Sequence, residues 1–334
     1  MAKAKDVSSH HHRMPRTYMK PWCFLSDSIW TYDKATGISE RRNIYKICWE
    51  SYYYSIRAGS IYTNDDALNK TYGLLSVHRI EFDGTVLSTP KDLNDHFLDF
   101  DKWDIFYPNG KRANKRDRNI IEQRLLSSSV NTIEERWSSR FENDWALFSD
   151  TIFQNLESVL RKGRTILTDY EAKNLMKYFV MFEWRGMIGN EMVNDVLQYS
   201  GTILKCSDVE IPRKERTYPN GRYEADEIKH AFLLKVFGEF LSDDGAMYEV
   251  YKLYCEKLSF VFLISDNENF VTSDNLCFTF INRERYKELV FIARPNFAIS
   301  LAKKDPSEPH AYKIHTLRTE DVVYFNKIIS KMAI

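Results

Sequence analysis

The sequence lacks the marks of several common functional classes. Lysine plus arginine and aspartate plus glutamate each number 47, so the formal net charge is +0 and any contact with nucleic acid or acidic membrane needs a local patch. The five cysteines are scattered and form no Cys-x-x-Cys pair for zinc or disulfide exchange, so they indicate reduced, mostly buried thiols. The Gly-x-x-x-x-Gly-Lys and His-Glu-x-x-His patterns are absent, which excludes ordinary nucleotide hydrolysis by a P-loop.

Long apolar runs are missing as well. The longest stretches, residues 178–182 and 260–264, are far shorter than the roughly 20 residues that span a bilayer. The lysines near the N-terminus have no apolar run behind them, so we expect neither a secretion signal nor a membrane partner, and a cytoplasmic location. A hydrophobic content of 43% with 14% aromatic residues is enough to fill a core.

Residues 1–90 favour strands and turns. Aromatic and β-branched residues between Trp22 and Tyr32, around a turn at Ser26-Asp27, predict an opening hairpin. A second hairpin is predicted around Asp83-Gly84, a preferred two-residue turn that follows alternating residues.

The middle of the chain, residues 91–258, has apolar residues at helical spacing. Possible capping boxes at Thr132 to Glu135 and Thr168 to Glu171 open the two longest helices, which we expect to pack antiparallel. The predicted helices cover residues 91–103, 114–129, 132–163, 168–199, 224–241 and 246–258.

The spacing changes again after residue 258. Short strand-like runs divided by Asn, Asp and Pro are followed by a closing helix over 319–332. The predicted strands are 260–264, 270–271, 277–281, 289–293 and 297–301. Because no long polar linker interrupts the chain, we expect one composite α+β domain over 1–334, with β-rich sections at 1–90 and 259–334 around a helical section at 91–258.

Two polar motifs near the chain ends resemble those of a known family. His12-x-x-Pro15 followed by Tyr18, and Thr272-Ser273-Asp274-Asn275 with Asn326 in the last helix, are similar to the family catalogued as domain of unknown function 4238. The resemblance spans nearly the whole chain. It departs at Leu276, where the family has proline, at Trp22, where it has phenylalanine, and over 58–90, which resembles an inserted hairpin. Trp184-Arg185-Gly186 is similar to a family Arg-Thr-Pro motif in the middle helix.

The histidines beside this motif have a direct chemical interpretation. In an extended segment His10 and His12 point to one face, an arrangement that two imidazole ligands of a metal use, and histidine is also the commonest acid or base near neutral pH. Terminal histidine runs are equally often disordered, which is the alternative for His10 and His11. His12 could also serve only to anchor the N-terminal segment through a hydrogen bond.

The two motifs lead to two hypotheses. In the first, the protein hydrolyses a phosphoester or nucleic acid, with His12, Asp274 and Arg185 as catalytic residues. In the second, the same residues form a structural clasp in a non-enzymatic binding or regulatory module. The residues expected to bind substrate are Tyr18, Asn275 and Asn326. Ser273 is a weak nucleophile candidate because no Gly-x-Ser-x-Gly elbow is present.

Two basic clusters are further candidates for phosphate contacts. The first runs from Lys111 to Arg118 and the second from Arg213 to Arg222, each near a tyrosine. Nucleic acid or a phosphorylated small molecule is therefore a candidate partner, although such charges are more often solvated and offset by carboxylates. The sequence identifies no cofactor and leaves open whether a metal binds and whether the chain forms oligomers.

Overall fold

The computed structural model describes residues 10–162, 167–186, 209–281, 287–304 and 312–333. These residues divide between two compact units. Unit 1 comprises Met1–His11, Ser51–Glu135 and Asp195–Gly238, and unit 2 comprises His12–Glu50, Arg136–Asn194 and Glu239–Ile334. Each unit is therefore formed from three separate stretches of chain.

Unit 1 contains a small sheet of order β7-β6-β8 with helices around it. The turn predicted at Asp83-Gly84 is confirmed: both residues have positive φ angles, 51° and 77°, as a tight hairpin turn requires. Trp103 and Ile105 are completely buried in its core. Its elements include β5 (Ile56–Arg57), α2 (Asp65–Tyr72), β6 (Arg79–Phe82), β7 (Thr85–Val86), α3 (Pro90–Asp95), β8 (Asp104–Phe106), α4 (Lys115–Ser127) and β9 (Ser129–Val130).

Unit 2 is organised around a five-stranded sheet of order β11-β12-β13-β10-β14. Its strands are β10 (Leu258–Ser265), β11 (Cys277–Ile281), β12 (Lys287–Arg294), β13 (Phe297–Lys303) and β14 (Lys313–Leu317). Neighbouring strands are antiparallel, except that β14 runs parallel to β10. The sequence predicted four of these strands and missed β14, while residues 270–271 lie in the connection from β10 to β11 and form no strand.

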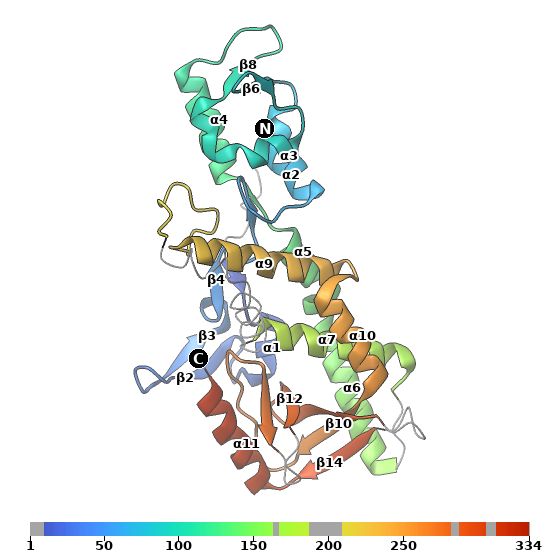
Figure 1. The fold of residues 1–334 in the computed structure, drawn as a ribbon. Coiled ribbons are helices and arrows are strands. Elements are labelled where there is room, and N and C mark those ends of the chain that lie inside the picture. The colour runs from blue at the N-terminus through green and yellow to red at the C-terminus, as the bar shows by residue number, and fades with distance from the viewer. Residues whose placement is uncertain (1–9, 163–166, 187–208, 282–286, 305–311, 334) are drawn as a thin grey trace. The chain divides into compact units, whose positions relative to one another are not determined.

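Helices cover both faces of this sheet (Figure 1). Successive side chains of a strand alternate between the faces, and β12 follows this rule. Val290 and Ile292 pack with Phe325 of α11 (Thr319–Met332) on one face. Phe291 stacks on Phe182 of α7 on the other face, with ring centroids 4.7 Å apart. The sheet is therefore the middle layer of unit 2.

The helices that follow the two predicted capping boxes pack antiparallel, as the sequence predicts. Trp145 contacts Phe182 and Phe148 contacts Tyr178, so the contacts move backward along α7 as they move forward along α6. The predicted capping box at Thr168 begins α7. The helices between residues 132 and 257, which belong partly to unit 1 and partly to unit 2, are α5 (Thr132–Trp137), a π-helical turn (Ser138–Glu142), α6 (Asn143–Lys162), α7 (Asp169–Arg185), α9 (Glu224–Leu241) and α10 (Gly245–Lys257). Residues 187–199 of the second predicted helix lie outside the described residues.

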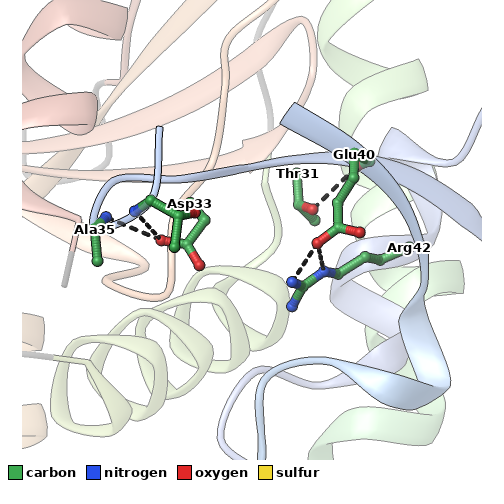
Figure 2. Close-up of polar contacts among 6 residues, drawn as sticks. Thr31, Asp33, Ala35, Glu40 and Arg42 are labelled. Carbon is green, nitrogen blue, oxygen red and sulfur yellow. Dashed lines mark hydrogen bonds and ion pairs between the residues drawn. The ribbon is translucent and has the colours of Figure 1, made fainter. Parts of the chain in front are cut away.

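The predicted turn at Ser26-Asp27 forms, and an isolated antiparallel bridge between Leu25 and Ser28 closes it. The longer hairpin, however, is one that the sequence did not predict: β2 (Ser28–Asp33) pairs with β3 (Ile38–Asn43), which follows it, so its turn lies at residues 34–37. The carboxylate of Asp33 accepts bonds from the backbone N–H groups of Ala35 and Thr36, at 2.9 and 3.1 Å, and shapes this turn (Figure 2). The remaining short elements of the N-terminal part are β1 (His10–His12), α1 (Arg16–Met19) and β4 (Trp49–Ser51), with β1 paired to β4.

The fold is thus of the α+β class that the sequence predicts. Among the described residues, no helix is both long and apolar enough to cross a membrane.

Candidate functional site

The connection between β10 and β11 in unit 2 carries the Thr-Ser-Asp-Asn motif. We call residues 269–275 of this connection the motif segment. Three side chains from distant parts of unit 2 hold it. They come from α1, from the short 3₁₀ helix at Lys20–Trp22 and from α11.

Tyr18 of α1 holds the centre of the motif segment. Its hydroxyl lies 2.7 Å from Oγ1 of Thr272 and donates to the carbonyl of Ile292 in β12 at 2.6 Å. The side chain has no exposed surface, and burial raises the pKa of its phenol well above the ordinary value. With this packing Tyr18 positions the segment, in place of the substrate contact expected from the sequence.

Asn326 and Trp22 hold the beginning of the segment. The side-chain amide of Asn326 accepts from the N–H of Val271 and donates to the carbonyl of Asn269, each at 2.9 Å. Trp22 Nε1 donates to the carbonyl of Phe270 at 3.1 Å. Because Asn326 satisfies backbone groups that no strand partner meets, it too has a positioning role here, whereas the sequence suggested that it binds substrate.

The end of the segment is a tight polar turn. The hydroxyl of Ser273 donates to the carbonyl of Asn275 at 2.8 Å and accepts from its N–H at 3.2 Å. This turn leaves the side chain of Asp274 exposed and buries that of Asn275, of which 3% is accessible. Asp274 is therefore the motif residue that faces solvent.

Asp274 lies near the segment that follows His12. Burial and the negative charge of Asp274 raise the pKa of the Cys48 thiol to about 11, whereas the positive charges of Arg13 and Arg42 oppose this change. The carbonyl of Cys48 accepts a 2.8 Å hydrogen bond from the N–H of Arg13. Cys48 is thus within electrostatic range of Asp274, and its backbone is hydrogen-bonded to the residue that follows His12.

Arg185 provides a second link, and its surroundings change its expected role. Its side chain is completely buried, forms an ion pair with Glu142 of the π-helical turn and lies 5.4 Å from the centre of the Trp137 ring. Its Nη2 donates to the backbone carbonyl of His12 at 2.5 Å. Because Glu142 neutralises the guanidinium, we assign Arg185 to holding the His12 segment, in place of the catalytic role predicted from the sequence.

Gly186, the next residue, contacts the motif segment directly. A Cβ atom at this position would lie 2.7 Å from Oδ1 of Asn275, closer than real contacts allow. Glycine allows this close approach without a shift of the Asn275 amide. The His12 segment and the Asp274 turn are thereby brought to one region of unit 2, with Arg185-Gly186 between them. Half-buried His12 and exposed Asp274 are the predicted residues that this arrangement leaves as candidates for chemistry.

Unit 1 contains a polar cluster that the sequence did not reveal. His11, for which disorder was one of the alternatives from the sequence, is completely buried in β1. Its Nδ1 accepts a 2.7 Å hydrogen bond from the N–H of Tyr54. His230 of α9 lies 3.0 Å from the carbonyl of Tyr53 and stacks on Tyr218. Burial lowers the pKa of His230 to about 4, so this imidazole is neutral near pH 7.

Unit 2 also contains an unpredicted buried acid, Glu183 of α7. Only 2% of it is exposed, and Tyr254 of α10 donates to its Oε1 at 3.1 Å. Burial raises the pKa of Glu183 to about 7, and burial together with the charge of Glu183 raises the pKa of the Cys277 thiol. The sequence signal for this acid is a single charge inside the apolar run from Tyr178 to Trp184, within a segment that the sequence predicts to be helical.

The first basic cluster divides into residues that build the fold and residues that face solvent. Arg118 donates to the carbonyls of Phe100 and Asp101, and Arg112 pairs with Asp104. Lys115 and Arg116 lie with Arg124 on an exposed face of α4, lining a shallow surface depression. In the second cluster, Arg216 and Arg222 pair with Glu210. Where the structure describes the chain, no three His, Cys, Asp or Glu side chains gather around a possible metal position.

Comparison with known proteins identifies the family and nothing further. No curated protein matches the chain, and no solved structure matches it. One family model, described as a protein of unknown function (DUF4238), matches residues 10–334. This range includes both motifs and every strand and helix described above. The chain therefore belongs to the DUF4238 family.

Proposed function

We propose that unit 2 hydrolyses a phosphoester, in a small molecule or a nucleic acid, at a site formed by His12 and Asp274. The observation that carries the proposal is the support given to one exposed carboxylate. Tyr18 and Asn326, which lie far from it in the sequence, fix the motif segment beside the segment that follows His12. A polar side chain on a rigidly held turn is typical of a functional site.

In this proposal His12 is the acid and base of the reaction. Its neutral imidazole accepts a proton from a water molecule as the water oxygen attacks phosphorus. The phosphorus–oxygen bond to the leaving group breaks, and the imidazolium returns the proton to the leaving oxygen. Asp274 orients the imidazole or shares a metal with it.

Arg13 is a better candidate than Arg185 to bind the anionic group. About a third of the Arg13 side chain is exposed, and its nitrogen lies 3.9 Å from the carboxylate of Glu50. Such partly exposed ion pairs contribute little free energy, so a phosphate can compete with the carboxylate. The buried guanidinium of Arg185 already has Glu142 as its counterion.

The test compares matched pairs of variants on bis(p-nitrophenyl) phosphate and on fluorescent oligonucleotides. His12→Ala and Asp274→Asn should each lower the rate by about 10²–10⁴-fold, the usual range for loss of an acid–base group. The controls are His315→Ala and Asp266→Asn, exposed residues of unit 2 outside the site. An equal rate in the His12 and His315 variants would remove His12 from the mechanism.

A specific observation favours a second function, a non-enzymatic binding or regulatory module. Tyr18, Asn326 and Arg185 all bond to protein atoms, as a structural clasp requires. In that case His12→Ala lowers the melting temperature, and neither the variant nor the wild type cleaves a phosphoester. A wild-type protein that cleaves none of the phosphoesters, together with a destabilised His12→Ala variant, would favour this module over the hydrolase.

A further inference from the structure

The β2–β3 hairpin of unit 2 exposes two large aromatic rings. Trp30 is 65% exposed and Tyr32 is 64% exposed, whereas Ile29 of the same strand is 8% exposed. Because side chains alternate along a strand, Trp30 and Tyr32 lie on the same, outward face, about 7 Å apart along β2. Large exposed aromatic side chains in close sequence mark binding surfaces more often than isolated ones do.

The strand register defines the rest of this face. Trp30 lies opposite Arg41, Tyr32 opposite Ser39, and Ser28 opposite Asn43. We call these six residues the outer hairpin face. It combines two rings with hydroxyl and amide groups, and its one charge is positive.

The opposite face of the hairpin carries charges of both signs. There Arg42 pairs with Glu40, and the hydroxyl of Thr31 donates to the carbonyl of Glu40 at 3.1 Å (Figure 2). On the outer face, by contrast, no carboxylate of the described chain forms an ion pair with Arg41. The two faces therefore differ in charge as well as in exposure.

The hairpin is held in place, and so is one of its rings. The ammonium of Lys34 in the turn donates to the backbone carbonyls of Lys331 and Ala333 at the end of α11. Phe24 stacks on Trp30, with ring centroids 6.0 Å apart and planes 19° apart. A ring that is already oriented loses less conformational freedom when a ligand stacks on it.

We infer that the outer hairpin face binds single-stranded nucleic acid, with bases stacked on Trp30 and Tyr32 and a phosphate at Arg41. Aromatic rings offer a stacking surface to any unpaired base, and a cation beside them meets the backbone. A duplex keeps its base faces stacked and unavailable, which is why the ligand is single-stranded. Ser28, Ser39 and Asn43 beside the rings, together with Arg41, make this face more polar than the core of a protein–protein interface.

One part of the inference rests on the proposed function, namely that the bound nucleic acid is also a substrate of the site. Binding itself does not require hydrolysis.

The test measures binding of a fluorescein-labelled 20-nucleotide oligothymidylate to the full chain by anisotropy, with the probe checked for integrity on a gel. Loss of a stacking ring weakens binding by about 5-fold to 150-fold per base, so Trp30→Ala and Tyr32→Ala should each show a loss in that range. The matched control, Tyr170→Ala with Tyr324→Ala, removes two rings of unit 2 that are 74% and 54% exposed. It should bind as the wild type does.

Charge is tested in the same assay. Arg41→Gln should reduce the slope of log affinity against log salt by about 0.7, the value for one phosphate of a single strand. Lys327→Gln, an exposed cation of α11, should leave that slope unchanged. Melting temperatures of these variants should stay near that of the wild type because the altered side chains are exposed.

Several results would overturn the inference. These are equal affinity in the Trp30 variant and the wild type, equal losses in the ring variants and their controls, or tighter binding to duplex DNA or anionic vesicles than to the single strand. The proposed function fails separately. If His12→Ala still cleaves bis(p-nitrophenyl) phosphate while Trp30→Ala loses the oligonucleotide, the surface stands and the catalytic assignment is wrong.

Discussion

Replacing Arg185 by methionine should destabilise unit 2 by about 3 kcal/mol. The guanidinium is completely buried, pairs with Glu142 and donates to the carbonyl of His12. Removing one partner of a buried ion pair costs about 3–5 kcal/mol because the other charge is left without compensation. The side chain of Glu142 is 13% exposed, so water can reach the remaining carboxylate, and the lower end of that range applies.

Scanning calorimetry measures this effect. In a unit of about 200 residues, 1 kcal/mol shifts the melting temperature by about 2–4 °C, so the variant should melt about 6–12 °C lower than the wild type. The control is Arg318→Met at the start of α11, whose ion pairs with Glu320 and Asp321 are exposed, so its melting temperature should stay near that of the wild type.

A double-mutant cycle separates the pair from the loss of side-chain packing. Glu142→Gln and Arg185→Met should together cost less than the two single changes added, with a coupling energy of about 1–3 kcal/mol. Additive effects, or a melting temperature of Arg185→Met within 2 °C of the wild type, would refute the assignment of Arg185 to holding the His12 segment.

Further predictions concern buried groups of unit 2. The pKa of Glu183 is about 7 in the folded chain against an ordinary 4.5, so stability from its neutral form is full below pH 4.5 and is lost as the pH rises through 7. The difference corresponds to about 3 kcal/mol. In the wild type, the free energy of urea unfolding should fall between pH 5 and pH 8, and in Glu183→Gln this pH dependence should disappear. An unchanged pH dependence in the variant would exclude Glu183 as its source. Tyr18→Phe removes both hydrogen bonds of the phenol and should cost about 1–3 kcal/mol in urea unfolding, and a wild-type midpoint would contradict the positioning role. Gly186→Ala should cost about 1–3 kcal/mol because its Cβ meets Asn275, whereas alanine at Gly73, where a Cβ meets nothing within 4 Å, should change stability by under about 1 kcal/mol.

Local signals explain which parts of the fold the sequence predicts. The turn at Asp83-Gly84 and the cap at Thr168 depend on residues within a few positions, and both form. β14 was missed because three of its five residues are exposed, which leaves no apolar alternation to detect. Phe270 and Val271 resemble a strand, but Asn326 bonds to Val271 and Phe270 packs against α11, so no strand pairing is available.

The candidate site divides in the same way. The motifs around His12 and Asp274 were visible because each is a short run of polar residues. The neutralisation of Arg185 was not, because its counterion Glu142 lies 43 positions earlier on a π-helical turn. The buried state of Glu183 likewise depends on Tyr254, which is 71 positions away. Pairings over such distances are set by packing and leave no local pattern.

The division of the chain into interleaved stretches has a consequence for folding during synthesis. The last stretch of unit 1 ends at Gly238, so all of its residues are made before the last stretch of unit 2, which begins at Glu239. That last stretch supplies the sheet and the closing helix of unit 2. The His12 motif of unit 2 is therefore made long before the Asp274 turn. Domains generally fold as units as the chain emerges. A truncated chain that ends near residue 250 and has been released from the ribosome should contain a protease-resistant unit 1 and an unprotected His12 segment.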